Sequence, residues 1–380
     1  MRVGLGVTVW TRGLLGGYQD GIGIYTQQLW QQFKASGVNA QAIAFGVSDE
    51  VKLDRRAPEP LECVAGDYRN QVARSIITGM PFRHVSGIRD KIDVFHSPDH
   101  HIPKLRHVPV VATIMDAIPI IHPEWVSMRL ARIKNAAFRR SSRWAQHIIT
   151  ISEYSKRDIV EAFGVNEDLV SVIPLGYDES FLKRFDQTQR QDVLGRYGLK
   201  EGFFVFVGTL QPRKNVKSLI LAHRLLPDEI KARHPLVIIG RYGWGDDGVI
   251  DEIRYMEKRG EGVWLRDVTT KDLPVLLQSS VSLVFPSLYE GFGLPVLEAF
   301  ASGIPVITSN SSSIPEVAGD AALFLDDPLN VDEITFNMQR IIEKPDLAES
   351  CVSLGYERLS NYSWRQCAEK TLSVYNSLIC

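Results

Sequence analysis

Short apolar runs alternate with longer stretches in which apolar positions recur every three to four residues. The runs Val3–Val9, Val108–Ile114 and His147–Ile151 predict buried strands in the first half of the chain. A glycine-rich loop, residues 16–23, is predicted to lead into an amphipathic helix over Ile24–Phe33. Alternation of strands and helices is typical of parallel sheets flanked by helices, so the predicted fold class is α/β.

The pattern stops between Glu179 and Gly202, where charged and polar residues dominate, and then starts again. Phe203–Val207, Leu236–Ile239 and Val281–Phe285 predict the strands of a second sheet. We therefore predict two doubly wound, Rossmann-like domains that face a cleft, with ligands bound at the carboxyl ends of the strands. The last segment of the chain, residues 363–380, is predicted to be mainly helical.

The most informative segment is Ser287–Glu298, which follows a predicted strand. Gly291 and Gly293 permit positive φ angles, and the proline that comes after them suits the first turn of a helix. Amides at such a helix start would face an anion just outside the end of the strand. Glu290 would lie at the mouth of the cleft, and Glu298, in the first helical turn, could accept hydrogen bonds from a vicinal diol. The segment thus predicts a site for a phosphate, a ribose and a sugar hydroxyl.

This segment resembles the nucleotide-sugar motif of retaining glycosyltransferases of family 4, which have the GT-B fold. In that motif seven residues separate two glutamates and usually include Gly-Phe-Gly-Leu-Pro, and Glu290–Glu298 matches it in full. The resemblance covers nearly the whole chain and is closer in the second half. It implies an acceptor-binding domain over residues 1–176 and a nucleotide-sugar-binding domain over residues 177–362. It also implies that the helix in residues 363–380 crosses back to the first domain.

Two cations follow the predicted strand Phe203–Val207. Gly208 comes directly after the strand, and Arg213 and Lys214 lie just before a predicted helix. Fixed cations there can stabilise the charge that develops on a departing diphosphate without a metal ion. The resemblance assigns an Arg and a Lys of this loop to the diphosphate. Because the sequence contains no Asp-x-Asp motif, we expect no metal ion and no other cofactor.

The remaining donor-site residues rest on weaker signals. The glycine-rich loop, which in the family lies under the diphosphate and the transferred sugar, is explained equally well as a plain strand-to-helix turn. Trp264–Val268 resembles the strand end whose backbone contacts the nucleotide base, although the family prefers glycine where this chain has Asp267. The residues predicted to bind the donor are Gly21, Gly23, Gly208, Asp267, Val268, Gly291, Phe292, Gly293, Leu294 and Glu298.

The first half departs from the family at one position. Relatives commonly carry His-Asp near the transferred sugar, where this chain has Met115 followed by Asp116. His96 and His100 lie at and just after the end of the preceding predicted strand, so either could approach the acceptor. The acceptor-side candidates are therefore His96, His100 and Asp116, whereas His101 is interpreted as an ordinary loop residue. Clustered histidines can bind a metal ion, but no further Cys or Glu lies at a usable spacing.

Composition narrows the class of protein further. The 380 residues are 44% hydrophobic and 23% charged, as in a soluble globular protein, and a net charge of −2 gives no general case for nucleic-acid binding. The four cysteines are scattered, which argues against a zinc site or a disulfide framework. Neither a signal peptide nor an apolar run near the ~18 residues of a membrane span is evident. We therefore expect a cytoplasmic protein.

A basic segment suggests one further partner. No acidic residue occurs between positions 126 and 152, and Arg129, Arg132, Arg139 and Arg143 would share one stripe of a helix. Peripheral enzymes use such faces on anionic lipid, which would place this chain on the inner face of the plasma membrane. A solvated helix face is the alternative.

The resemblance implies a retaining, metal-independent glycosyltransferase with Arg213, Lys214 and Glu290 as its catalytic residues. We expect it to move a hexose, by preference mannose from GDP-mannose, to a saccharide or a polyprenyl-diphosphate-linked saccharide. The pathway would be cell-surface polysaccharide or lipopolysaccharide biosynthesis. UDP-linked hexoses and GDP-linked deoxysugars stay open as donors. A sugar-nucleotide epimerase of GT-B fold and a catalytically inactive nucleotide-sugar-binding partner are the alternative functions.

Overall fold

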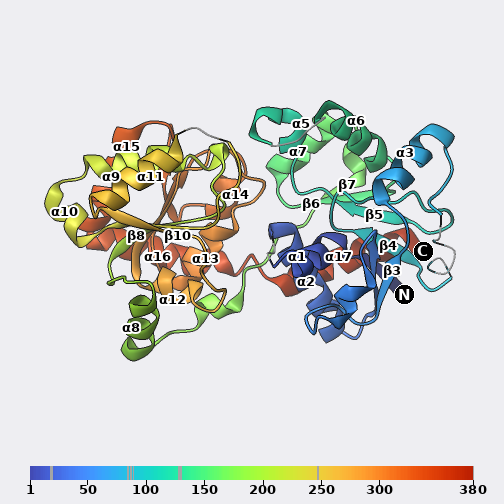
Figure 1. The fold of residues 1–380 in the computed structure, drawn as a ribbon, viewed down its shortest axis with the longest axis horizontal. Helices are drawn as coiled ribbons and strands as arrows, with labels where there is room; N and C mark the ends of the chain where they lie inside the picture. Colours follow the sequence, from blue (N-terminus) through green and yellow to red (C-terminus); the bar gives the residue numbers. More distant parts are fainter. Residues whose placement is uncertain are drawn as a thin grey trace. The chain divides into compact units, whose positions relative to one another are not determined.

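The computed structural model describes the chain except for residues 18–19, 84, 86–87, 89, 127–130, 246–247 and 380. Two compact units make up the chain (Figure 1). The first unit comprises Met1–Pro123, Met128–Gly176 and Trp364–Cys380, and the second comprises Glu124–Ser127 and Tyr177–Ser363. The C-terminal helix α17 (Trp364–Ile379) is therefore part of the first unit.

The first unit contains a seven-stranded sheet in the order β3-β2-β1-β4-β5-β6-β7, and all neighbouring strands are parallel. The chain first builds outward from β1 and then returns to its other side at β4, so the strand order reverses between these two strands. In open α/β sheets, ligands bind at this switch point. The strands are β1 (Arg2–Gly6), β2 (Asn39–Phe45), β3 (Leu61–Val64), β4 (Val94–Ser97), β5 (Val110–Thr113), β6 (His147–Thr150) and β7 (Val170–Val172).

The start of the first unit differs from the prediction. Strand β1 ends at Gly6 rather than Val9, and the residues expected to form strand and loop instead form helix α1 (Thr8–Gly16). Helix α2 begins at Gly21 because the side chain of Asp20 accepts a hydrogen bond from the backbone N–H of Gly23 and caps the helix. The other helices of this unit are α3 (Tyr68–Thr78), α5 (Ile118–Ile121), α6 (Ala131–Ser142) and α7 (Glu153–Phe163).

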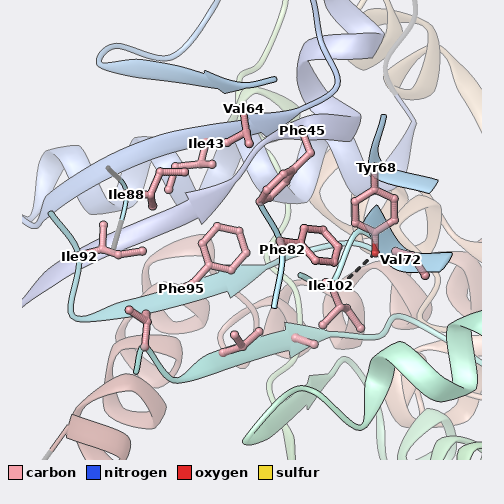
Figure 2. Packing of buried hydrophobic residues seen from close by; sticks show 13 residues of the cluster. Ile43, Phe45, Val64, Tyr68, Val72, Phe82, Ile88, Ile92, Phe95 and Ile102 are labelled. Carbon is pink, nitrogen blue, oxygen red and sulfur yellow. Dashed lines mark hydrogen bonds between the residues drawn. The ribbon is translucent and has the colours of Figure 1, made fainter. Parts of the chain in front are cut away.

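A buried aromatic cluster fixes the loop that follows β4 (Figure 2). The Phe45 ring meets the rings of Phe82 and Phe95 edge-on, each at a centroid distance of 6.0 Å. Close to them, the Tyr68 hydroxyl donates to the backbone carbonyl oxygens of His100 and Ile102, at 3.0 and 3.1 Å. The core thus holds both ends of the segment that carries the histidines after β4.

The second unit contains a six-stranded parallel sheet in the order β10-β9-β8-β11-β12-β13. Its strand order reverses between β8 and β11. The strands are β8 (Phe203–Val207), β9 (Leu236–Ile239), β10 (Gly262–Leu265), β11 (Ser280–Phe285), β12 (Val306–Ser309) and β13 (Ala322–Leu325). The prediction of two doubly wound parallel sheets is confirmed.

The helices of the second unit are α8 (Gln187–Arg196), α9 (Val216–Leu225), α10 (Asp228–Arg233), α11 (Val249–Lys258), α12 (Leu273–Gln278), α13 (Leu294–Ser302), α14 (Ile314–Ala318), α15 (Val331–Glu343) and α16 (Pro345–Leu359). At the end of β9 the backbone passes so close to β8 that a Cβ on Gly240 would lie 2.1 Å from the Gly208 carbonyl oxygen. Only glycine fits there. None of the helices in the described parts of the chain is long and apolar enough to cross a membrane.

Candidate active site

Two cations and one carboxylate meet at the switch point of the second unit. Arg213 and Lys214 form a short 3-10 turn after β8, and Glu290 lies in the loop after the adjacent strand β11. The Arg213 Nη1 atom lies 2.8 Å from Oε2 of Glu290, and the Lys214 Nζ atom lies 2.6 Å from Oε1. Residues that are 76 and 77 positions apart in the sequence thus form one charged cluster.

Backbone hydrogen bonds join the two loops that carry this cluster. The backbone N–H of Leu288 donates to the Arg213 carbonyl oxygen at 2.7 Å, and Arg213 Nη1 donates to the carbonyl oxygen of Tyr289 at 2.9 Å. Asn215, which has a positive φ of 53°, ends the turn and donates through Nδ2 to the carbonyl oxygens of Pro286 and Pro328. The arrangement places both cations on a rigid frame.

The cluster is largely shielded from solvent and contains two cations and one carboxylate. The side chains of Arg213, Lys214 and Glu290 are only 17%, 10% and 8% exposed. Burial would raise the pKa of the Glu290 carboxyl, but the charges of Arg213 and Lys214 outweigh burial and hold this pKa at about 2. Glu290 is therefore ionised at neutral pH, and its carboxylate lies against two fixed cations. Such a site favours an anion.

The position of Glu290 differs from the expectation that it would lie at the mouth of a cleft. Its carboxylate is buried, and each of its oxygens pairs with one of the neighbouring cations. A serine-rich loop after β12, which sequence reasoning missed, supports the backbone here. Ser312 Oγ accepts from the Glu290 N–H, and Ser313 Oγ donates to the carbonyl oxygens of Glu290 and Phe292 at 2.9 and 3.0 Å.

The predicted donor residues around Glu290 lie in one loop and one helix start. Gly291, Phe292 and Gly293 are buried, and Leu294 is the first residue of α13. Gly293 has a φ of 114°, and a Cβ there would lie 2.7 Å from Cδ1 of Ile314. A side chain at this position would therefore displace the start of α13.

Glu298 lies one turn later than expected. Because α13 begins at Leu294, Glu298 is its fifth residue and belongs to the second turn. The side chain is partly buried. Burial and the neighbouring carboxylate of Asp178 raise the pKa of Glu298 from 4.5 to about 7. This carboxyl therefore exchanges a proton near neutral pH, unlike Glu290.

The other predicted donor residues of this unit follow different strands. Gly208 follows β8 directly and precedes the turn that carries Arg213 and Lys214. Asp267 and Val268 follow β10, which lies two strands away from β8. The Asp267 carboxylate is exposed and lies 2.8 Å from Arg241 Nη2, and Val268 is half-buried.

His96 is a core residue, which corrects its prediction as an acceptor-side group. Its ring is fully buried, with Nε2 2.7 Å from the Thr113 hydroxyl and Nδ1 2.5 Å from the Tyr375 hydroxyl of α17. Burial lowers the pKa of His96 to about 3, so the ring is neutral. With both ring nitrogens engaged inside the first unit, His96 cannot contact an acceptor.

The remaining predicted residues of the first unit lie nearer the surface. His100 is exposed, and Asp116 is half-buried at the start of α5, where its Oδ1 accepts from the Ile118 N–H at 3.0 Å. Gly21 and Gly23 belong to the first turn of α2 rather than to a loop. Their expected role under a diphosphate stays a prediction.

Sequence reasoning also missed a hydrogen-bonded chain that passes through His101. Nδ1 of this ring lies 2.9 Å from an Asp99 carboxylate oxygen, and Nε2 lies 3.1 Å from Nη1 of Arg12. Asp99, His100 and His101 lie close enough together to surround a cation, since their ligand atoms are within 4.8 Å of one another. Both nitrogens of His101 are nevertheless engaged, one of them by a guanidinium. The geometry therefore favours the hydrogen-bonded chain over a metal site.

Comparison with known proteins identifies the family of this chain. Residues 190–358 match the family described as Glycosyl transferases group 1, and residues 19–181 match Glycosyltransferase Family 4. The O-antigen chain mannosyltransferase B of Escherichia coli is 32% identical over 300 residues, which cover 78% of each chain. The chain belongs to the family 4 glycosyltransferases. A second similar protein, the O-antigen chain mannosyltransferase RfbU of Salmonella typhimurium, is 28% identical over 60% of this glycosyltransferase and 58% of its own length.

Solved structures support the fold of this glycosyltransferase. The HepE protein of Anabaena, crystallised in complex with UDP, superimposes with a TM-score of 0.76 at 16% identity. The match covers 99% of this chain and 100% of that protein. At this identity the likeness shows the fold alone.

The glycosyltransferase also carries a basic face on α6. Arg132, Arg139, Arg140 and Arg143 are exposed and, with Ala136, line a hollow of about 450 Å³. Within the described ranges of the chain, none of these four guanidinium groups forms an ion pair. Arg129, the first member of the predicted stripe, lies outside the described residues.

Proposed function

We propose that this glycosyltransferase is a retaining, metal-independent mannosyltransferase that uses GDP-mannose to extend a lipid-linked saccharide in O-antigen-type polysaccharide biosynthesis. The observation that carries the proposal is the Arg213–Lys214–Glu290 cluster, in which two cations are fixed beside one carboxylate at the switch point of the second sheet. The choice of mannose and of a polysaccharide acceptor is supported by the likeness to the O-antigen mannosyltransferases of Escherichia coli and Salmonella typhimurium.

The cluster suits the departure of a nucleoside diphosphate. As the bond to the sugar breaks, negative charge grows on the diphosphate oxygen, and Arg213 and Lys214 stabilise it from fixed positions. Glu290 holds both cations and exchanges part of this contact for a sugar hydroxyl when the donor binds. Glu298 accepts hydrogen bonds from the ribose hydroxyls.

In the proposed reaction the configuration is retained because the acceptor hydroxyl attacks from the side that the diphosphate leaves. The hydroxyl then forms the new glycosidic bond, and its proton moves to the departing phosphate oxygen. No protein base is needed in this scheme, which is consistent with Met115 at the position where relatives carry histidine. The cations supply the charge stabilisation that a metal ion provides in other transferases.

We further propose that the face on α6 docks on anionic membrane lipid at the inner face of the plasma membrane. Apolar side chains accompany the four arginines, as an interfacial helix requires. Ile133 of α6 is 64% exposed. Helix α3 packs against α6, and Ile77 at its end and Met80 just beyond are 82% and 54% exposed. A lipid-linked acceptor would then be presented to a protein already at the bilayer.

The test is transfer from labelled nucleotide sugars to a membrane extract, with and without EDTA. The proposal expects transfer from GDP-mannose that survives EDTA, and a product in which NMR shows the anomeric configuration of the donor. A changed sugar without transfer would support the epimerase, and binding without either reaction would support the inactive partner. A thermal-shift panel of nucleotide sugars identifies the donor, since a ligand at ~100 times its dissociation constant stabilises by about 2.7 kcal/mol.

A further inference from the structure

The first unit has its own charged cluster at its switch point. Arg12 comes from α1, which starts directly after β1, and Asp99 and His101 come from the loop after β4. Strands β1 and β4 are neighbours, and the strand order reverses between them. Ligands of doubly wound sheets bind at such positions. The proposed donor chemistry uses none of these three residues.

The three side chains form a hydrogen-bonded series in which the donor of each bond is fixed. The Asp99 carboxylate accepts from the His101 backbone N–H at 2.5 Å and lies 2.9 Å from Nδ1 of the ring. A guanidinium can only donate, so Nε2 of His101 must accept from Arg12. The ring proton then lies on Nδ1 and is donated to Asp99. Asp99 therefore orients His101, and His101 orients Arg12.

The three hydrogen-bonded residues differ in their burial, and this difference suggests a ligand. Asp99 and His101 are 3% and 5% exposed, whereas Arg12 is an exposed residue. Within the described part of the chain, the other N–H groups of Arg12 have no hydrogen-bond acceptor. A long side chain is thus held by buried partners, while most of its donors have no acceptor among the residues that the structure describes. Pre-organisation of this kind lowers the entropy lost on binding.

The surrounding charges favour a neutral, hydroxyl-rich ligand over an anion. Asp20 is close enough to Asp99 for their carboxylates to interact electrostatically. The positive charges of Arg12 and Arg69 both interact with the exposed His100. Two carboxylates and two guanidinium groups balance one another, so a phosphate would gain little net attraction. A sugar, whose hydroxyls both donate and accept, can use groups of both signs.

We propose that Arg12, held in place by Asp99 and His101, binds hydroxyl groups of the acceptor saccharide. Arg12 contacts the ligand, and Asp99 and His101 are positioning residues. The identity of the ligand as the acceptor rests on the proposed function, whereas the binding itself requires no turnover.

The test is isothermal titration calorimetry of the full chain with a mannose-terminated trisaccharide, with GDP present. Arg12→Gln should weaken binding of the trisaccharide about 10- to 100-fold, the range typical of a lost hydrogen bond to a charged group. GDP affinity should stay unchanged. Arg55→Gln, which removes another exposed arginine of the same unit, is the matched control and should bind like the parent.

Variants of His101 distinguish a residue that positions Arg12 from one that contacts the ligand directly. His101→Leu should weaken trisaccharide binding as much as Arg12→Gln, and the double variant should be no weaker than either, because both changes remove one interaction. His101→Gln, whose amide oxygen can accept from Arg12, should restore most of the affinity. GDP binding and thermal unfolding of each variant report whether the protein is folded.

The outcomes distinguish this inference from the proposed function. Parent-like trisaccharide binding by Arg12→Gln, equal losses in Arg55→Gln, or no binding by the parent would each overturn the role of Arg12. A parent that binds the trisaccharide through Arg12 but transfers no sugar would refute the mannosyltransferase and leave the saccharide site in place.

Discussion

Glu290 has a structural role as well as a proposed chemical one. Arg213 and Lys214 are adjacent in sequence, one partly and the other fully buried, and the Glu290 carboxylate between them offsets their mutual repulsion. Removing one partner of a buried ion pair typically costs about 3–5 kcal/mol, because the other charge stays buried without compensation. Variants at this cluster should therefore be judged on folding and turnover separately.

Arg213→Ala should lower kcat by ~10²–10³, since the lost group stabilises charge that develops only as the diphosphate leaves. Affinity for the free nucleoside should change little. Initial-rate kinetics on GDP-mannose and nucleoside binding check both statements. Arg254→Ala is the control, because Arg254 is an exposed arginine of the same unit that pairs only weakly with Asp251 at 3.3 Å. Parent-like turnover in Arg213→Ala would remove this residue from the chemistry.

Glu298 should make nucleotide affinity depend on pH. Its pKa of about 7 means that the carboxylate, which accepts two hydrogen bonds from a diol, forms only as pH rises through 7. Affinity for GDP should therefore increase about 10-fold between roughly pH 6 and pH 8. Calorimetry over this range measures the change. Glu298→Gln should give a flat profile, and Glu229→Gln, an exposed glutamate of α10, should keep the parent profile.

The same carboxyl has the opposite effect on stability. In the unfolded chain Glu298 ionises near 4.5, but in the folded protein it ionises near 7, because of burial and Asp178. The contribution of Glu298 to folding stability should thus be greatest below about pH 4.5 and should be lost as the pH rises to 7. Asp178→Asn should shift the midpoint of the affinity profile to lower pH. An unchanged midpoint would show that Asp178 does not act on Glu298.

At the scale of elements, the turn after β8 depends on Asn215. This residue adopts the left-handed conformation and ties the cation loop to the carbonyl oxygens of Pro286 and Pro328. Asparagine suits both tasks, since it tolerates positive φ and carries two side-chain donors. The turn therefore positions Arg213 and Lys214 through contacts that lie outside the charged cluster.

Asn215→Gly and Asn215→Ala separate these two contributions. The glycine variant keeps the backbone conformation and loses the hydrogen bonds, whereas the alanine variant also adopts φ of 53° at a cost of about 1 kcal/mol or more. Both should lower stability in urea unfolding, alanine more than glycine, and both should lower kcat. Equal stability of the two variants would mean that backbone strain is negligible at this turn.

At the scale of the whole molecule, the two units follow one scheme. Each sheet has a single reversal of strand order, and each reversal carries a cluster of hydrogen-bonded polar and charged side chains: Arg213, Lys214 and Glu290 in one unit, Arg12, His101 and Asp99 in the other. Loops diverge at a switch point and leave room for side chains from two strands. On this basis we propose that the donor binds in the second unit and the acceptor in the first.

Membrane docking should depend on the α6 face. Changing Arg132, Arg139, Arg140 and Arg143 to Gln should release the protein from anionic vesicles, because each cation near an anionic surface contributes about 1 kcal/mol. Vesicle sedimentation measures the release, and transfer to a short soluble acceptor should survive. Lys200, Arg233, Arg254 and Lys258 of the second unit are all exposed, so their change to Gln is a charge-matched control. Equal release by both variants would indicate a net-charge effect rather than a docking face.

The sequence by itself determined the α/β class, the parallel sheets and the residues of the cation loop and the glutamate motif. These features are local, since buried parallel strands appear as apolar runs and the motif residues lie within one loop. The first helix was missed because Val7, Thr8 and Val9 continue an apolar run, and a short run does not distinguish a strand from a buried helix. The hydrogen bond by which Asp20 caps the start of α2 was also recognised only in the structure.

Only the tertiary structure decided what each histidine does. His96 became a core residue because Tyr375, 279 positions later, covers its ring. His101, interpreted as an ordinary loop residue, became part of an ordered chain because Arg12 lies against it from 89 positions earlier. The pKa of Glu298 likewise depends on Asp178 in a distant segment. Burial and hydrogen-bond partners arise from contacts between residues far apart in sequence, and the spacing of residues along the chain does not encode these contacts.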